Sequence, residues 1–165
     1  MPFCYWNWDI LDTYLVSPGP CPVGYTHSEW SPWPGICYKA FNTPKTFSES
    51  AETCVKDGGT LAIPRDANTN DFLIKLKNTV DHTSTYWFGL DDRHMEGSFE
   101  WADGTRLYGH QFDFWAPGEP NDFNNFEDCV HYEASQDPEF ANKWDDGSCD
   151  TTAGFICEVI PGSAE

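Results

Sequence analysis

Three stretches of this 165-residue sequence decide its fold: Glu119-Pro120-Asn121-Asp122, Glu127-Asp128-Cys129 and Trp144-Asp145-Asp146. All three are rich in carboxylate and amide oxygens, the donors of which Ca²⁺ takes about six to eight. Zinc would favour His or Cys ligands, and magnesium would keep mostly water. The alternating donors of an EF-hand loop do not occur. The three stretches therefore predict a calcium site built from long loops.

The acidic residues are concentrated in the same region. The chain has 27 Asp and Glu against nine Lys and Arg, a net charge of −18. Fifteen of the acids lie between Asp91 and Asp146, where three basic residues occur. We expect neither nucleic acid nor an anionic membrane surface as a partner, because both bind cationic faces. A solvated acidic face is the common alternative for such a segment, but the Gly, Asn, Pro and Trp residues among these acids favour a structured loop that holds a cation.

The cysteines indicate an oxidising compartment. Seven of them are scattered along the chain, and no pair has the Cys-x-x-Cys spacing of a zinc or redox site. Scattered cysteines in a small, loop-rich chain are typical of disulfides, so we expect a secreted, extracellular protein. No apolar stretch is long enough to cross a membrane, and we expect no membrane insertion. Spacing alone leaves the pairing open, and the odd count leaves at least one thiol free or bonded to another chain.

The pattern along the chain predicts an α+β domain. Residues 1–20 form an aromatic-rich N-terminal extension that ends in a Pro/Gly boundary, residues 21–160 form the domain, and residues 161–165 form a C-terminal tail. A hairpin is expected between Cys21 and Lys39. Thr46 and Glu49 make a capping box that opens a helix, which ends at Gly58-Gly59.

A second helix is expected to open near Asn68 or Thr69, and strands follow it. The apolar face predicted for that helix comprises Phe72, Leu73, Leu76 and Val80. Short strand-like runs then occur at Tyr86–Leu90, Ser98–Trp101, Cys129–Tyr132 and Gly154–Val159. The long segments between them hold most of the acids, and loops of that length in a compact domain are usually functional.

These motifs together resemble the C-type lectin domain family. The resemblance rests on the three acidic stretches in order, on the strand Trp87-Phe88-Gly89-Leu90 and on the helical segment from Phe47 to Leu61, and it covers Cys21 to Glu158. It implies a C-type lectin-like fold, in which two helices accompany small antiparallel sheets and long calcium-binding loops. It also implies the pairings Cys21–Cys37, Cys54–Cys157 and Cys129–Cys149. Cys4 is left unpaired or forms an interchain bond, which would link a homodimer.

The resemblance assigns ligands to two calcium ions. The primary site would comprise Glu119, Asn121, Glu127, Asp145 and Asp146, with a cis peptide before Pro120. The auxiliary site would comprise Asp92, Glu96, Asp122 and Asp128, and would share Glu127. In the family the primary ion also binds two neighbouring sugar hydroxyls, which here would contact Glu119, Asn121, Glu127 and Asp145. The Glu-Pro-Asn triplet is similar to that of lectins for mannose, glucose, fucose and N-acetylglucosamine. These sugars share vicinal hydroxyls of the equatorial type.

One residue departs from the family pattern. Asp145 stands where the family usually has Asn, and an ionised carboxylate cannot donate a hydrogen bond to a sugar hydroxyl. We expect calcium binding to persist while one sugar contact weakens.

The sequence favours two functions, in a definite order, over a third, an enzyme. The first is a calcium-dependent lectin for glycans, acting on microbial surfaces in innate immunity by family analogy. The second is a calcium-stabilised protein-binding module with little sugar affinity. An enzyme is not expected, because the acids are taken up as metal ligands and no nucleophile motif occurs. The five histidines show no metal-binding spacing and are assigned no role.

Overall fold

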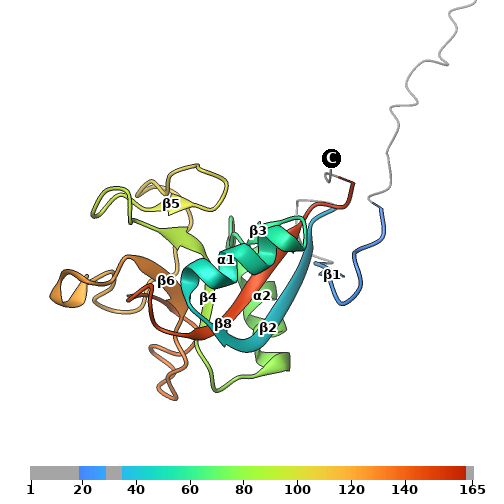
Figure 1. Ribbon diagram of the computed structural model, residues 1–165. Coiled ribbons are helices and arrows are strands. Elements are labelled where there is room, and N and C mark those ends of the chain that lie inside the picture. Colours follow the sequence, from blue (N-terminus) through green and yellow to red (C-terminus); the bar gives the residue numbers. More distant parts are fainter. Residues whose placement is uncertain (1–18, 29–34, 163–165) are drawn as a thin grey trace, which may run out of the picture.

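The computed structural model describes residues 19–28 and 35–162, which fold around one hydrogen-bonded sheet (Figure 1). Within these residues the sheet has eight strands, and its main path runs β1-β2-β8-β4-β6-β7, with β3 paired to β8 and β5 paired to β4. The strands are β1 (Thr26–His27), β2 (Cys37–Lys45), β3 (Thr60–Leu61), β4 (Tyr86–Asp91), β5 (Glu100–Trp101), β6 (Cys129–Tyr132), β7 (Trp144–Gly147) and β8 (Ala153–Val159). The helices are α1 (Phe47–Lys56) and α2 (Ala67–Val80), and one short 3₁₀ turn, η1, spans Phe123–Asn125.

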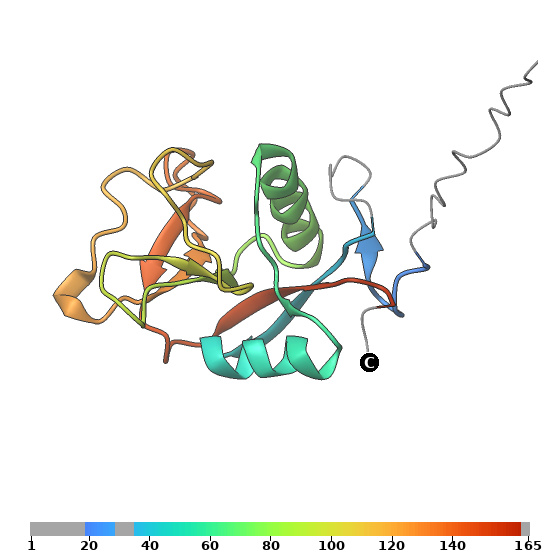
Figure 2. The ribbon, with the colours of Figure 1, turned by 90° about the horizontal axis from the view of Figure 1, so that it is seen from above.

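Strand β8 forms the centre of the sheet. All seven of its residues are buried, which is typical of a strand covered on both faces. Figure 2 shows the reason, because α1 and α2 lie on opposite sides of the β2–β8 pair. Gly154 permits the close approach of β4, since a Cβ at this position would lie 2.7 Å from the Tyr86 ring.

The α+β class is confirmed, but the sheet is not wholly antiparallel as the sequence predicted. Strands β4 and β8 pair in parallel, with Tyr86 opposite Gly154 and Trp87 opposite Phe155. The chain between these strands leaves the core to form the acidic loops, β6 and β7, and β8 then returns in the same direction as β4. This crossover gathers the loops at one end of the sheet, seen at the left of Figures 1 and 2.

The predicted hairpin and first helix are confirmed. Strand β1 pairs antiparallel with β2, with Thr26 opposite Tyr38. The capping box of α1 is complete: the Glu49 amide donates to the Thr46 hydroxyl at 3.3 Å, and the Thr46 amide donates to Glu49 Oε2 at 3.0 Å. The helix ends at Lys56, and its C-cap Asp57 precedes Gly58, which has φ of +86°. Residues 29–34, between the two strands of the predicted hairpin, lie outside the described residues, as does Cys4.

Helix α2 begins slightly earlier than predicted and buries a different face. Asp66 caps it by accepting from the Thr69 amide at 2.8 Å. Leu73 is buried as predicted, whereas Val80 at the end of the helix is 41% exposed, so its place on the buried face was wrong. The polar residues Asn70 and Lys77 are fully buried instead. A polar residue can occupy such a position when a buried partner satisfies it, which an apolar periodicity does not reveal.

Aromatic side chains form the core beneath the loops. Trp144 is fully buried, and its ring lies 5.6 Å from Trp115, 5.8 Å from Trp101 and 5.3 Å from Phe88. These pairs are tilted or edge-to-face, the arrangements that aromatic rings prefer. Trp144 therefore lies in the core with the partly buried Trp115 packed against it, and the residues next to Trp144 are held on a rigid base.

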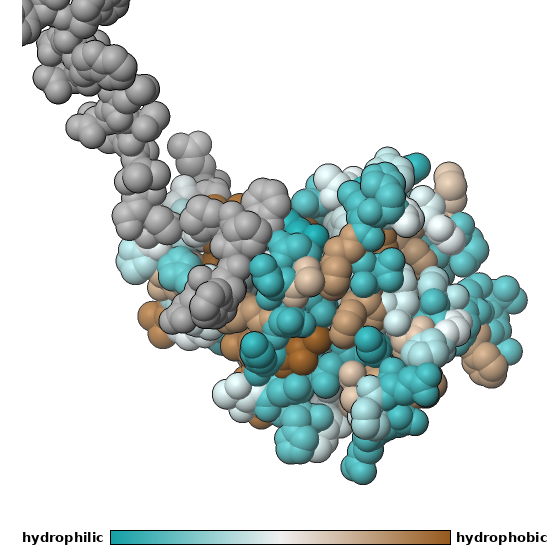
Figure 3. All heavy atoms as spheres, turned by 180° about the vertical axis from the view of Figure 1, so that it is seen from behind, coloured by the Kyte–Doolittle hydropathy of each residue, from teal (hydrophilic) through white to brown (hydrophobic). Residues whose placement is uncertain are grey.

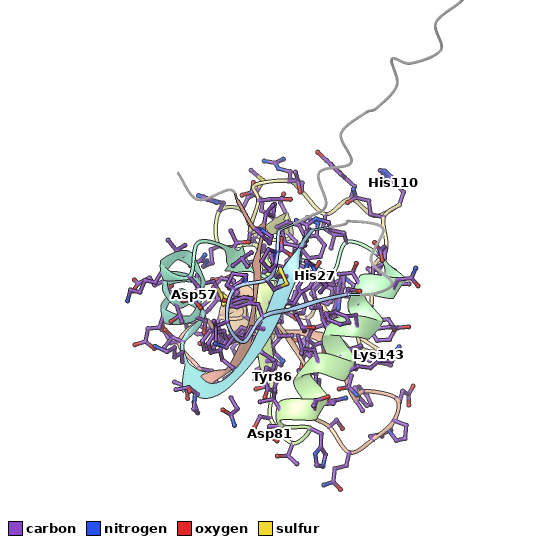
Figure 4. The ribbon with its side chains drawn as sticks, turned by 90° about the vertical axis from the view of Figure 1, so that its right-hand side faces the viewer. His27, Asp57, Asp81, Tyr86, His110 and Lys143 are labelled. Carbon is purple, nitrogen blue, oxygen red and sulfur yellow. A yellow bond between two sulfur atoms is a disulfide. The ribbon has the colours of Figure 1, made fainter. Side chains whose placement is uncertain are left out.

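Three disulfides hold the ends of the domain together. They join Cys21 to Cys37, Cys54 to Cys157 and Cys129 to Cys149, the pairings that the resemblance implies. Figure 4 shows His27 beside a disulfide, in agreement with its 3.8 Å contact to Cys37 Sγ. Hydrophilic residues cover most of the face seen in Figure 3, with smaller hydrophobic areas between them. Among the described residues, no helix is long and apolar enough to cross a membrane.

Candidate functional site

Two backbone hydrogen bonds attach the segment that leads to Glu119 to strand β7. The Trp144 amide donates to Phe114 O at 2.9 Å, and the Ala116 amide donates to Trp144 O at 2.8 Å. A turn then follows, in which the Glu119 amide donates to Ala116 O at 3.0 Å. The peptide between Glu119 and Pro120 is cis, as the sequence resemblance implied. The loop thus places Glu119 next to the two acids that follow Trp144 in β7.

The first acidic cluster consists of Glu119, Asp145 and Asp146. One carboxylate oxygen of each lies within 4.8 Å of the others. The Asn121 side chain joins the cluster by donating from Nδ2 to Glu119 Oε1 at 2.7 Å. The other oxygen, Glu119 Oε2, is buried and has no hydrogen-bond partner. Four of the five predicted primary-site residues are therefore brought together, and one buried oxygen is left available.

Asp146 also fixes the loop backbone. It is only 2% exposed, and its Oδ1 and Oδ2 accept from the amides of Asn121 at 2.9 Å and Asp122 at 2.8 Å. These two bonds hold the Asn121 backbone and satisfy a buried charge. The loop geometry at this point is therefore set by the protein itself.

The cluster is electrostatically unfavourable by itself. Burial, followed by the charges of Glu119, Glu133, Asp146 and Glu127, raises the pKa of Asp145 to about 7. Burial also raises the pKa of Glu119, to which nearby Asp146 adds. Both shifts arise because carboxylates are crowded in a partly dehydrated place, and a bound cation would remove that cause.

A second acidic cluster forms where β4 ends. Asp91 is opposite Cys129 across the β4–β6 pair, and the Asp92 amide donates to Asp128 O at 3.0 Å. This register brings carboxylate oxygens of Asp92, Glu96 and Asp128 within 4.8 Å of one another. Asp92 Oδ2 accepts from the Gly97 amide at 2.7 Å, whereas its buried Oδ1 has no partner. Burial, followed by the neighbouring charges, raises the pKa of Asp92 to about 6.

Glu127 and Asp122 are hydrogen-bonded to each other but belong to neither group of close carboxylates. Glu127 Oε2 accepts from the Phe123 amide at 2.9 Å, and the Glu127 amide donates to Asp122 Oδ1 at 3.2 Å. Glu127 also lines a cavity of about 270 Å³ together with Asp145 and Asp146. Burial raises its pKa, with contributions from Asp146 and Asp122. Its predicted role as a ligand shared by two ions stays a prediction.

The residues of both clusters fit calcium. Their donors are carboxylate and amide oxygens, and each cluster has a buried carboxylate oxygen without a partner. Burial, followed by the neighbouring charges, raises the pKa values of Asp92 and Asp145. These are the properties of hard-cation ligands. Glu119, Asn121, Asp145 and Asp146, with Glu127 close by, would hold the primary ion, and Asp92, Glu96 and Asp128 would hold the auxiliary ion.

Sequence reasoning missed a third cluster. Oxygen or nitrogen atoms of His131, Glu133 and Asp145 lie within 4.8 Å of one another. Burial lowers the pKa of His131, and its buried Nδ1 has no hydrogen-bond partner. The signal in the sequence is the i, i+2 spacing of His131 and Glu133 on a strand, but their proximity to Asp145 depends on the pairing of β6 with β7.

Comparison with known proteins agrees with this architecture. The family model of the lectin C-type domain matches residues 43–159. The C-type lectin BfL-2 of Bungarus fasciatus is 35% identical over 141 residues, which are 84% of this chain and 82% of that protein. The alpha-N-acetylgalactosamine-specific lectin of Patiria pectinifera is 32% identical over 136 residues, 79% of this chain and 77% of that lectin.

A solved structure is similar as well. The cow carbohydrate-recognition domain of CD23, crystallised in the presence of a GlcNAc2Man3 oligosaccharide, is 27% identical and superposes with a TM-score of 0.71. The match covers 86% of this chain and 96% of that domain.

Proposed function

The chain belongs to the C-type lectin domain family, and from this premise we propose that its loop region binds calcium and, together with the ion, the vicinal hydroxyls of a sugar. As a member of this family the chain is a binding protein and not an enzyme. The observation that carries the proposal is the group formed by Glu119, Asn121, Asp145 and Asp146, which contains a buried carboxylate oxygen without a partner.

Each side chain of the proposed site has a separate role in binding. Calcium, when bound, supplies open coordination positions for two neighbouring hydroxyls. Asn121 presents an amide that donates to a sugar oxygen, and the Glu119 carboxylate accepts from a hydroxyl. Asp146 keeps the loop backbone in position through its bonds to the amides of Asn121 and Asp122. Because the fully buried Trp144 precedes Asp145, the acids of β7 start from a rigid base.

The sugar class follows from the Glu-Pro-Asn triplet. We place mannose, glucose, fucose and N-acetylglucosamine in it, and the mannose-containing oligosaccharide named for the CD23 domain supports this choice. The alpha-N-acetylgalactosamine-specific relative shows that the family also includes lectins of another class. Asp145 accepts but does not donate when ionised, so one sugar contact is lost relative to an Asn. That loss costs about 0.5–1.5 kcal/mol of binding free energy.

Thermal melting combined with column retention tests the proposal. Calcium should raise the melting temperature relative to EDTA, and the calcium-loaded protein should be retained on immobilised mannose and released by EDTA. Calcium alone should restore retention after EDTA is removed. Retention that EDTA leaves unchanged would overturn the calcium-dependent lectin.

A pair of variants tests the residues. Glu119→Gln with Asn121→Asp reverses acceptor and donor at the sugar, and should move retention from mannose toward galactose. The matched control makes the same chemical changes at exposed positions of the helices, Glu52→Gln with Asn68→Asp, and should leave retention on mannose unchanged. A double variant that keeps the original preference would remove these two residues from the sugar site.

A second function is favoured by Asp145 alone. If the missing donor abolishes sugar binding, calcium serves only to order the loops, and the domain binds a protein. That function predicts a melting shift with calcium and no further shift with any sugar at concentrations well above millimolar.

Secretion and pairing of chains complete the proposal. Three disulfides support an oxidising, extracellular location. A single weak sugar site gains avidity when two copies are linked, and Cys4 would provide the link in a homodimer. Recognition of microbial surface glycans in innate immunity would use that avidity. Non-reducing electrophoresis of the full chain and of Cys4→Ser tests the link, and a monomer in both would exclude it.

A further inference from the structure

The pairing of β6 with β7 brings three metal-binding side chains to one face of the sheet. Successive residues of an extended chain point to opposite faces, so His131 in β6 and Glu133, the first residue after β6, share a face. His131 is directly opposite Asp145 in the antiparallel register, and cross-strand partners also share a face. The alternate residues Val130 and Tyr132 are buried on the core side. The register therefore explains why one ligand atom from each of His131, Glu133 and Asp145 lies within 4.8 Å of the others.

The imidazole of His131 has an unused hydrogen-bonding group. Its Nδ1 is buried without a partner, which is costly for a polar atom unless a ligand or water satisfies it. The ring packs edge-on against Trp87, with centroids 5.3 Å apart, and a Cβ at Gly147 would lie 2.9 Å from Nε2. Trp87 thus packs against the imidazole ring, and the absence of a side chain at position 147 leaves room for it.

The three side chains also line one cavity. It has a volume of about 270 Å³ and lies among β6, β7 and the segment before β8. Glu127 and Asp146 line the same cavity, and none of the described residues that line it is a Lys or Arg that would neutralise the acids. A cavity of this size has room for an ion and the water that completes its coordination.

The donor set differs from that of the two calcium clusters. Calcium takes oxygen ligands, whereas an imidazole with two carboxylates suits zinc, which is commonly held by three protein ligands with a fourth position open to water. We propose that His131, Glu133 and Asp145 form a zinc site next to the sugar-binding loop, which shares Asp145 alone with the proposed primary calcium site. Asp145 supplies one carboxylate to both, so an Asn at this position would leave zinc with two charged or imidazole ligands. The departure from the family pattern at position 145 thereby acquires a function.

Zinc binding by the full chain is measured by equilibrium dialysis in the presence of excess calcium, which fills the all-oxygen clusters. One zinc per chain should be retained. Cobalt used in place of zinc should give the visible absorption bands of a four-coordinate nitrogen and oxygen site. Glu133→Gln, which keeps every proposed calcium ligand, should weaken zinc binding at least about tenfold, since loss of a supporting group alone has an effect of that size.

The control variant is Glu139→Gln, which removes the same charge from an exposed residue of the loop between β6 and β7. It should bind zinc as the original chain does. Equal zinc binding by Glu133→Gln and Glu139→Gln would mean adsorption to the acidic surface and would overturn the proposal, as would the absence of bound zinc. His131→Gln should lose zinc too, and Glu133→Gln keeps the test decisive if the His131 variant does not fold. Sugar retention with calcium alone is measured separately, so failure of either proposal leaves the other distinguishable.

Discussion

Replacement of Asn70 tests whether the buried polar contact between α2 and β7 supports the calcium loop. Asn70 is fully buried, and its Oδ1 accepts from the Tyr132 hydroxyl at 2.8 Å and from Trp144 Nε1 at 3.0 Å. Both donors are themselves buried. In Asn70→Leu the acceptor is lost, and two buried donors have no partner within the fold.

The expected loss of stability is large. An unsatisfied buried donor costs about 1–3 kcal/mol, so two give about 2–6 kcal/mol. Part of this is recovered, because Leu buries more apolar surface and removes Asn70 Nδ2, which has no partner in the original chain. We therefore expect a loss of about 3 kcal/mol. For a domain of this size that corresponds to a fall in melting temperature of roughly 6–12 °C.

The assay is thermal melting in calcium, with two comparison variants. Tyr132→Phe removes one hydrogen bond without leaving a donor unpaired, and should cost about 1 kcal/mol. Asn68→Leu makes the same substitution at an exposed position of α2, and should change the free energy of unfolding by less than about 0.5 kcal/mol. Because Trp144 precedes Asp145, Asn70→Leu should also weaken calcium binding measured by titration. A melting temperature for Asn70→Leu equal to that of Asn68→Leu would refute the reasoning.

Three further predictions concern charge. Asp145→Asn restores a donor to the sugar site and should strengthen retention on mannose by about 2–10-fold, the equivalent of one hydrogen bond; weaker retention would contradict the role given to Asp145. In EDTA, the raised pKa values of Asp145, about 7, and Asp92, about 6, mean that the folded chain binds more protons than the unfolded chain between pH 4 and 7. The metal-free protein should therefore gain stability from these groups as the pH falls from 7.5 to 5.5, while the melting shift caused by calcium shrinks, and the pH effect should be smaller in Asp145→Asn. Burial lowers the pKa of Lys77 to about 8, so the folded chain binds fewer protons than the unfolded chain between pH 8 and 10 and this group adds stability as the pH rises. Lys77→Met should accordingly raise the free energy of unfolding by about 1–3 kcal/mol at pH 7. In this variant the free energy of unfolding should also increase less between pH 7 and pH 9.5, which denaturant titrations at each pH would measure. A destabilised variant would refute the cost assigned to the buried ammonium.

The sequence predicted the helices and strands that are stabilised by interactions between neighbouring residues. The capping box of Thr46 and Glu49 lies within one turn of α1, and its side chains satisfy the helix amides wherever the helix packs. Strand β6 likewise has the predicted bounds, Cys129–Tyr132. Strand β7 was not predicted, because its four residues Trp-Asp-Asp-Gly have little strand propensity and are ordered by pairing with β6.

Long-range contacts decided what the sequence could not predict. Asn70 occupies a buried position of α2 because Tyr132 and Trp144 from other elements donate to it. Lys77 is buried too, where its ammonium donates to Asn78 Oδ1 and lies over the Tyr86 ring, whereas the periodicity favoured Val80. The motif predicted the carboxylates of the primary cluster, since their order along the chain is diagnostic. The contact of His131 with Asp145 was not predicted, because the register of β6 and β7 becomes known only from the folded sheet.

The loop region combines a preformed backbone with an unfavourable charge, and this combination determines how calcium should act. The bonds from the Asn121 and Asp122 amides to Asp146 hold the loop before any ion binds, so an ion need not order the whole segment. The raised pKa values of Asp92 and Asp145 indicate where the energetic cost remains, at carboxylates that are partly buried and that also repel one another. At the proposed site calcium would therefore act mainly by neutralising charge, and its stabilisation should follow its concentration, reaching about 2.7 kcal/mol at 100 times the dissociation constant. A loop that ordered only with calcium would instead show protected amides only in the calcium-loaded protein, so hydrogen exchange at Asn121 and Asp122 in EDTA separates the two mechanisms.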